Sequence, residues 1–257
     1  MKGKIELNDR NRPLVSIITV VRNGGQVLEK TIRSVAAQDY DNIEYIIIDG
    51  ASTDNTVEII KKNEKDIDYW VSEPDRNTED AFNKGIGKSH GELIGMITCG
   101  DWYEPDTVSS VVRAFLADRS VDVIYGNLKK WRGDKLLYLA RPPLNLDKLR
   151  RSMVLNFLDC FITKRSYETH GLYTEKYWVA TDYELLLRFY TRGLKFKYLN
   201  KVLANMTAGG NSEVHQVRGI YECYLISRQY GYPIFKAFPV LIGRLIKWLG
   251  RLILNKL

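Results

Sequence analysis

EYIIID at residues 44–49 and LIGMITCGD at residues 93–101 decide the fold: each is a short apolar run that ends on an acid. Runs of this length, rich in β-branched residues and followed by a helical pattern, are typical of strands buried on both faces of a sheet. Ligands of an open α/β sheet bind in the crevice outside the carboxyl ends of its strands. The two runs therefore predict Asp49 and Asp101 at one sheet edge, where a carboxylate can hold a cation, a ribose or a base.

The neighbouring sequence continues this alternation of strand and helix. The pattern predicts strands at residues 14–21, 43–48, 69–71, 93–98 and 121–125, and helices at about 27–38, 56–63, 78–88 and 105–117. Strand and helix at this spacing indicate an α/β fold with a right-handed, doubly wound, mostly parallel sheet. From residue 127 a mixed half follows, with an antiparallel excursion at 127–139 that turns at 132–134, strands at 162–164 and 196–203, and a helix at 181–191.

Composition indicates one globular unit of 257 residues that begins in the cytoplasm, because residues 1–12 lack the pattern of a signal peptide. Three cysteines, Cys99, Cys160 and Cys223, fit neither a disulfide framework nor a zinc spacing. The net charge of +7 lies mostly at the C-terminal end. Residues 216–257 contain seven Lys or Arg against Glu222 alone, and the rest of the chain lacks the basic face that nucleic acid would require.

The basic C-terminal segment has a helical pattern over residues 238–257. One face carries Leu241, Ile242, Leu245, Trp248, Leu249, Leu252 and Ile253, and the other carries Arg244, Lys247, Arg251 and Asn255. Cations at the centre make a membrane-spanning helix costly, whereas an amphipathic helix suits the plane of an anionic membrane surface. The alternative is a helix that packs on its own domain or on a partner subunit.

Six motifs occur in a fixed order along the chain. They are residues 15–23 (VSIITVVRN), 48–56 (IDGASTDNT), 72–76 with 80–86 (SEPDR, DAFNKGI), 91–103 (GELIGMITCGDWY), 180–188 (ATDYELLLR) and 209–212 (GGNS). Together they resemble family 2 glycosyltransferases, the inverting enzymes of GT-A fold that build bacterial polysaccharides. The resemblance implies a GT-A domain over residues 1–213, with a nucleotide-binding half at about 14–126 and an acceptor half at about 127–213. Residues 214–257 then form the membrane-association segment.

The resemblance assigns roles to three acids. It implies that Asp49 bonds the nucleotide base, that Asp101 coordinates a Mn²⁺ or Mg²⁺ ion bridging the donor diphosphate, and that Asp182 is the catalytic base. Oxygen ligands suit these cations. Each acid also has a plain structural interpretation: Asp49 and Asp101 as turn acids, and Asp182 as a helix N-cap with Glu184 as the other candidate base. Asp54 fits helix capping better than ligand contact.

The resemblance also implies a set of donor-binding residues. The set comprises Thr19, Val20, Arg22, Asp49, Asp75, Arg76, Asp80, Asn83, Lys84, Cys99 and Gly100. A guanidinium such as that of Arg76 suits a diphosphate, and Arg22 either stacks on the base or is a solvated charge.

The sequence departs from the family pattern at three places. Gly100 stands where the first acid of a pair usually occurs, Asn77-Thr78-Glu79 replaces Gly-Ile-Tyr, and residues 156–161 lack a histidine. In that last segment Asp159 is a candidate for the acceptor pocket.

These residues favour a metal-dependent inverting hexosyl- or N-acetylhexosaminyltransferase. We expect a nucleotide-diphosphate sugar, a UDP-sugar in particular, as donor, and a hydroxyl of a glycan or a polyprenyl-diphosphate-linked oligosaccharide as acceptor, in cell-surface polysaccharide synthesis. The basic segment predicts peripheral attachment to the inner face of the cell membrane. A nucleotidyltransferase is disfavoured because Gly24-Gly25 is too short for a phosphate loop. A non-catalytic, membrane-associated assembly subunit is the other alternative, and Gly100 is its main support.

Overall fold

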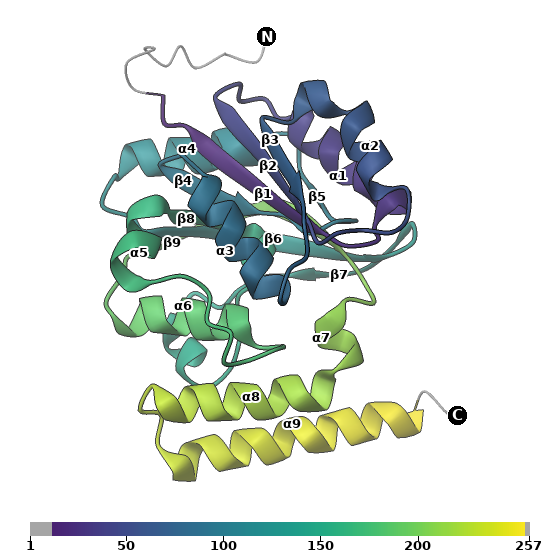
Figure 1. Ribbon diagram of the computed structural model, residues 1–257. Coiled ribbons are helices and arrows are strands. Elements are labelled where there is room, and N and C mark those ends of the chain that lie inside the picture. The colour runs from purple at the N-terminus through teal and green to yellow at the C-terminus, as the bar shows by residue number, and fades with distance from the viewer. Residues whose placement is uncertain (1–11, 255–257) are drawn as a thin grey trace.

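The computed structural model describes residues 12–254. Its centre is one twisted sheet with helices on both faces (Figure 1). The strands are β1 (Val15–Val21), β2 (Ile43–Asp49), β3 (Tyr69–Ser72), β4 (Leu93–Met96), β5 (Trp102–Tyr103), β6 (Val123–Arg132), β7 (Lys135–Ala140), β8 (Cys160–Thr163) and β9 (Phe196–Thr207). They run in the order β3-β2-β1-β4-β8-β6-β9-β5, with β7 paired to β6.

Most of the helices form two layers over the sheet. The helices are α1 (Gly25–Ala36), α2 (Thr56–Lys62), α3 (Thr78–Lys88), α4 (Thr107–Ala117), α5 (Lys164–His170), α6 (Thr181–Thr191), α7 (Asn211–Val214), α8 (Gln216–Gln229) and α9 (Ile234–Leu254). One buried cluster joins α1, α2 and α4 to the sheet, and a second joins α3, α5, α6 and α8 to its other face. Strands covered on both faces read as continuous apolar runs, as the sequence predicts.

The N-terminal half has the predicted parallel arrangement. β1 pairs in parallel with β2 and β4, and β2 with β3. In this register Val21 lies opposite Asp49 and Asp49 opposite Ser72, so the three strands end together. Asp49 is therefore the last residue of its strand, at the edge where the sequence places it.

Two predictions about the sheet need correction. The strand at residues 121–125 does not follow β4 as the next parallel neighbour, because β8 inserts between β4 and β6 and is antiparallel to both. β4 also ends at Met96 rather than residue 98, and the Asp101 amide donates to the Thr98 carbonyl at 3.1 Å. Asp101 thus follows a turn in which Gly100 has φ +93°, a conformation that favours glycine.

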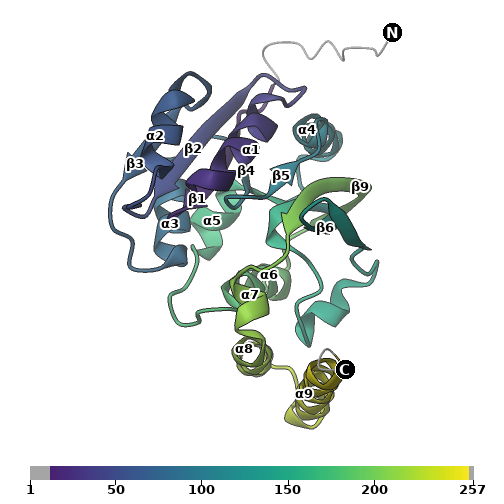
Figure 2. The same cartoon turned by 90° about the vertical axis from the view of Figure 1, so that its right-hand side faces the viewer.

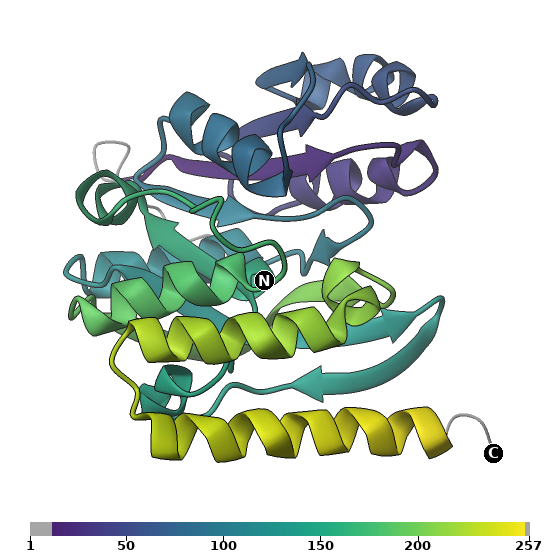
Figure 3. The same ribbon diagram turned by 60° about the horizontal axis from the view of Figure 1, so that its bottom comes forward.

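Helices α8 and α9 form an antiparallel pair beneath α6 (Figures 1 and 3). In the view of Figure 2, α9 lies farthest from the sheet. α9 faces α8 through Ala237, Val240, Leu241 and Arg244. Within residues 12–254, no helix has the length and apolarity that crossing a bilayer requires. Residues 1–11 of the predicted first domain, and 255–257 of the predicted C-terminal segment with Asn255, lie outside the described residues.

Candidate active site

Asp101 and Asp182 line one cavity of about 180 Å³, although they lie far apart in the sequence. Asp101 comes from the turn after β4, and Asp182 from the first turn of α6. The remaining lining residues come from α3, the turn after β4, β6, the segment before β8, the start of α6 with the segment before it, β9 and the segment before α7. They are Thr78, Glu79, Phe82, Thr98, Lys130, Phe157, Trp178, Val179, Thr181, Met206, Thr207 and Gly210. The structure therefore brings the predicted metal ligand and the predicted base to a common space.

Asp101 is held at the cavity wall by hydrogen bonds to its carboxylate. Thr98 Oγ1 donates to Oδ2, and the Thr207 amide donates to Oδ1 at 2.7 Å. Burial raises the pKa of Asp101 to about 6, although these bonds and the charges of Lys130 and Lys30 oppose the rise. A buried carboxylate of this kind gains from a nearby cation.

The surroundings of Asp101 fit a divalent cation that shares its ligands with a substrate. Within the described chain, no group of three or more His, Cys, Asp or Glu residues could enclose a metal ion. Mg²⁺ commonly binds through one or two carboxylates together with substrate phosphates and water. One carboxylate that opens on a cavity meets that requirement. An acid at position 100 would have to adopt the positive φ of Gly100, so the local backbone suits the single-acid arrangement.

Asp182 faces the cavity with an unsatisfied oxygen. Oδ1 is buried and has no hydrogen-bond partner. Burial, followed by the nearby charge of Glu79, raises the pKa of Asp182 to about 7, and the Tyr173 hydroxyl offsets part of the rise. A group that titrates near neutral pH is well matched to general base catalysis.

The helix-cap interpretation of Asp182 is not needed to explain its position. α6 begins at Thr181 with no side-chain cap bond. Instead, the carboxylate of Glu222 on α8 accepts from the amides of Trp178, Val179 and Ala180 at 2.8–3.2 Å. These amides are thus satisfied from another helix.

The alternative base Glu184 points elsewhere on α6. Its carboxylate accepts from the Tyr230 hydroxyl and pairs with Arg188 at 3.2 Å. Glu184 lines none of the cavities described here. Its surroundings indicate a role in joining α6 to the end of α8.

Glu79 is a site residue that sequence reasoning passed over. It is 3% exposed, and Thr181 Oγ1 donates to its Oε1 at 3.0 Å. Its Oε2 is buried without a partner, and burial raises its pKa. The available signal was its replacement of a family tyrosine directly before Asp80. Lys130, Trp178 and Thr207 also escaped notice, because their strand and loop positions carry no motif.

A second cavity of about 480 Å³ adjoins the first and shares Thr78, Thr98 and Trp178 with it. Five predicted donor residues line it: Val20, Arg22, Asp75, Arg76 and Cys99. Cys99 Sγ lies 3.5 Å from the Gly24 carbonyl oxygen, and burial raises the pKa of its thiol to about 12. Cys99 therefore contributes as an uncharged side chain.

Three of the other predicted donor residues make contacts within the protein, two of them with residues that line this second cavity. Asp49 is fully buried and accepts from the Ser52 amide at 3.0 Å and the Ser72 hydroxyl at 2.6 Å. Asp80 binds Arg76 at 2.6 Å, and Lys84 binds Asp75 at 2.7 Å. Their contacts with a donor remain predictions.

Three further predicted residues make contacts within the protein. Asn83 exchanges two 3.0 Å hydrogen bonds with the backbone of Tyr173. Thr19 is fully buried, with Oγ1 3.0 Å from the Tyr45 hydroxyl. Asp54 accepts from the Thr56 amide at 3.0 Å just before α2, whose N-cap residue is Asn55.

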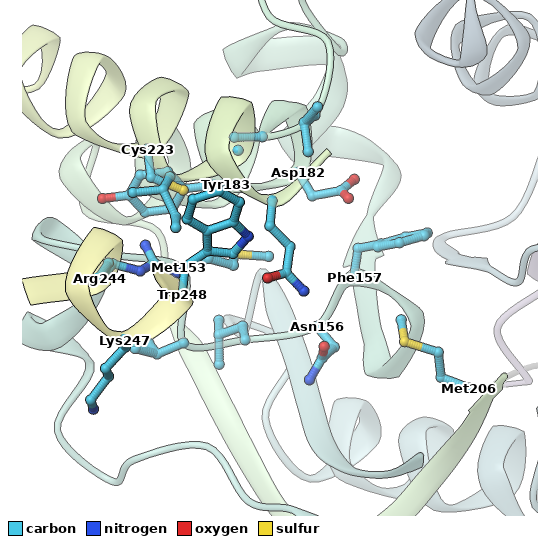
Figure 4. Close-up of a pocket in the computed structure, with 17 residues that line it drawn as sticks. Met153, Asn156, Phe157, Asp182, Tyr183, Met206, Cys223, Arg244, Lys247 and Trp248 are labelled. Atoms are coloured by element: carbon cyan, nitrogen blue, oxygen red, sulfur yellow. The ribbon is translucent and has the colours of Figure 1, made fainter. Parts of the chain in front are cut away.

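A third and larger cavity, of about 520 Å³, extends from Asp182 to α9 (Figure 4). Its floor comes from residues 153–157, and its sides from α6, α8 and α9. Asp159, the candidate for the acceptor pocket, does not line it: the side chain is 2% exposed and faces Cys160, whereas Asn156 and Phe157 do line the cavity. The predicted role of Asp159 therefore gains no support from this cavity and stays a prediction.

Comparison with known proteins gives consistent results. The family described as "Glycosyl transferase family 2" matches residues 16–172. An uncharacterized glycosyltransferase of Mycobacterium tuberculosis (strain ATCC 25618 / H37Rv), Rv1514c, is 33% identical over 183 residues, which is 68% of each protein. Hyaluronan synthase of Pasteurella multocida is 29% identical over 223 residues; the match covers 84% of this chain and spans only 23% of that synthase.

Solved structures share the architecture at low sequence identity. S. aureus TarS 1–349 in complex with UDP-GlcNAc matches with a TM-score of 0.68 at 15% identity, over 90% of this chain and 71% of that one. Mannosyltransferase PcManGT from Pyrobaculum calidifontis, in complex with GDP-Man and Mn²⁺, matches with a TM-score of 0.68 at 17% identity, over 93% and 76%. At these identities the likeness concerns the fold.

Proposed function

The chain belongs to glycosyl transferase family 2 and has the GT-A fold that its sequence predicts, and from this premise we propose that it is an inverting sugar transferase. The donor is a nucleotide-diphosphate sugar, and the acceptor is a hydroxyl of a glycan or a lipid-linked oligosaccharide. The observation that carries the proposal is the common cavity of Asp101 and Asp182, which adjoins the cavity lined by the predicted donor residues.

The proposed reaction is a single displacement. Asp182 accepts the proton of the acceptor hydroxyl through its unpartnered Oδ1. The hydroxyl oxygen forms a bond to the anomeric carbon while the bond from that carbon to the diphosphate breaks, which inverts the configuration. One carboxylate is sufficient because no covalent intermediate forms. Asp101, with Thr98 and Thr207 fixing its orientation, would hold the divalent cation. When bound, Mn²⁺ or Mg²⁺ neutralises charge on the leaving diphosphate.

The residues that line the second cavity support a nucleotide as its ligand. Arg22 and Trp178 offer a guanidinium and an indole for stacking. Arg76, paired with Asp80 and Glu175, lines this cavity next to the one that Asp101 lines. TarS and PcManGT were solved with UDP-GlcNAc and GDP-Man respectively, so fold alone leaves the base open. We favour a UDP-sugar, as the sequence resemblance implies.

A panel experiment tests the proposal. The purified protein is incubated with Mn²⁺ and individual UDP-, GDP- and dTDP-sugars, and nucleoside diphosphate release is measured with and without membrane lipid extract as acceptor. We expect release with one nucleotide class, and a loss of about 100-fold or more in Asp101→Asn. Arg33→Gln on α1 is the control for expression and folding. Binding of a nucleotide sugar without any release would favour the non-catalytic alternative.

We further propose that α9 attaches the enzyme to the inner membrane surface. One side of this helix is apolar and exposed: Phe235 is 72% exposed, Phe238 53%, Ile242 39%, Ile246 63% and Leu249 51%. These positions fall on a single stripe at helical spacing. Only part of the predicted apolar face belongs to it, because Leu241, Leu245 and Trp248 are half-buried. α9 therefore packs on its own domain, as the alternative interpretation has it, and its exposed apolar side supports the proposed membrane contact.

Vesicle sedimentation tests this attachment. Phe238→Ser/Ile246→Ser should reduce binding to vesicles of phosphatidylglycerol at least ten-fold, because two exposed apolar side chains leave the stripe. Leu136→Ser/Tyr138→Ser on β7 is the matched control, since these side chains are 45% and 54% exposed on another part of the surface. Equal losses in both double variants would contradict the assignment to α9.

A further inference from the structure

The large cavity between α6 and α9 has opposite charges at its two ends. Asp182 lines the cavity on the α6 side, and Arg244 and Lys247 line it on the α9 side (Figure 4). The remaining lining is apolar or uncharged, with Met153, Phe157 and Trp248 among the large side chains. At about 520 Å³ the cavity falls within the usual range for small-molecule sites, about 300–1,000 Å³.

Neither cation has a carboxylate partner within residues 12–254. Arg244 is half-buried and lies close to Cys223 and Tyr183. A partly desolvated guanidinium without an anion is unfavourable, so this end of the cavity gains from an anionic ligand.

Tyr183 gives a second, independent indication of a ligand. It is 1% exposed and lines the same cavity, yet its hydroxyl is buried with no hydrogen-bond partner. Buried polar groups in folded proteins are nearly always partnered. An oxygen-rich anion would accept from this hydroxyl and from the guanidinium together.

We propose that this cavity is the acceptor site and that Arg244, Lys247 and Tyr183 bind a phosphate or diphosphate group of the acceptor. The inference rests on the proposed function and extends it from the reaction to the class of acceptor. Arg244 and Lys247 are three residues apart on α9 and so project from neighbouring positions on one side of the helix. Two adjacent cations, one of them a planar fork, suit a phosphate better than a single carboxylate.

The position of the site relates the acceptor to the proposed membrane contact. The same helix offers its cations to the cavity and its apolar stripe to the outside. An acceptor anchored in lipid would place its phosphate at the depth of the headgroups, beside α9. The sugar beyond that phosphate would then extend towards Asp182, with Trp248 as an aromatic surface for the ring.

Calorimetry with inorganic pyrophosphate in metal-free buffer tests the anion site without requiring turnover. Arg244→Gln/Lys247→Gln should weaken pyrophosphate binding at least ten-fold. Lys236→Gln, which removes an exposed cation from the first turn of α9, should stay within two-fold of wild type. If the double variant folds poorly, Lys247→Gln alone, at an exposed position, should still weaken binding about three-fold.

Tyr183→Phe separates binding from packing. Its hydroxyl has no partner in the protein, so the variant should lose affinity for pyrophosphate a few-fold without a lower melting temperature. Wild-type affinity in the double variant, or no binding by the wild type, would overturn the proposal. The proposal would also be overturned if the double variant lost binding to phosphatidylglycerol vesicles but kept its affinity for pyrophosphate, because the two cations would then bind the membrane lipid. Pyrophosphate binding at α9 without release of nucleotide from any sugar donor would instead count against the proposed function alone.

Discussion

The two sides of helix α3 differ in how their polar groups are satisfied. On the donor side, Arg76 bonds Asp80 and Glu175, and Lys84 bonds Asp75 and Glu73, so the loop at residues 73–77 is braced by charges within the protein. On the catalytic side, Glu79 and Asp182 each retain a buried oxygen without a partner. The charged groups of the donor side are therefore paired within the protein, whereas two carboxylate oxygens of the catalytic side gain partners only when a ligand binds.

The largest expected effect follows from removing the free oxygen of Asp182. Asp182→Asn should reduce transfer by roughly 10²- to 10⁴-fold, because general base catalysis contributes about that much. Nucleotide binding should persist. The measurement is transfer rate under saturating donor, with Glu184→Gln as a control that removes the other acid of α6. Substantial activity in Asp182→Asn would refute the base assignment.

Asp182→Asn should raise the stability of the folded protein even though it lowers the transfer rate. The pKa of Asp182 is about 7 in the folded protein, against about 4 in the unfolded chain. Between these pH values only the unfolded chain loses the proton, so the free energy of unfolding falls as pH rises, whereas below about pH 4 both states are protonated. The stabilisation from Asp182→Asn should therefore grow as pH rises from about 4 to 7 and stay constant above that. We expect a gain on the order of 1–4 kcal/mol at pH 8, and little change at pH 4, in urea unfolding. A loss of stability at pH 8 would show that this oxygen is satisfied.

The comparison also explains which parts the sequence could reveal. The strand runs and helix patterns of residues 14–117 depend on local periodicity, and the structure reproduces them with small shifts. The insertion of β8 between β4 and β6 depends on pairing between distant segments, which periodicity does not encode.

The candidate site divides in the same way. Asp101 and Asp182 stand in motifs and were predicted, and the structure brings them to one cavity. Glu79 and Arg244 stand outside the motifs, and Tyr183 stands in one that gives it no role. Their importance arises only in the fold, which leaves Glu79 Oε2 and the Tyr183 hydroxyl buried without partners and brings Arg244 to a cavity. Charge patterning placed Arg244 and Lys247 on a polar helix face, but only the packing of α9 on α8 turns that face towards a cavity.

A smaller effect is expected from neutralising Glu79. Its charge raises the pKa of Asp182, so Glu79→Gln should let the base ionise at lower pH. The low-pH limb of the kcat profile should therefore move to lower pH, with a modest change at the plateau. Glutamine keeps an oxygen for the Thr181 hydroxyl, which preserves the contact between α3 and α6.

Glu168→Gln, an exposed carboxylate on α5, is the control for general charge loss. Its profile should coincide with that of wild type. If the midpoint of the low-pH limb in Glu79→Gln stayed at the wild-type pH or moved to higher pH, Glu79 and Asp182 would not be electrostatically coupled.

The smallest effect on activity is expected on the donor side, where the charged side chains are already paired with one another. Arg76 is 70% exposed and engaged by Asp80 and Glu175, so Arg76→Gln should raise the donor KM about two- to five-fold and leave the pH profile unchanged. Arg33→Gln is a matched control, because Arg33 is 73% exposed and makes the same i,i+4 contact with Glu29 at 2.8 Å. A rise of 100-fold would mean that Arg76 leaves its carboxylates to bind the diphosphate directly. The donor side would then also be completed by its ligand, and the contrast across α3 would disappear.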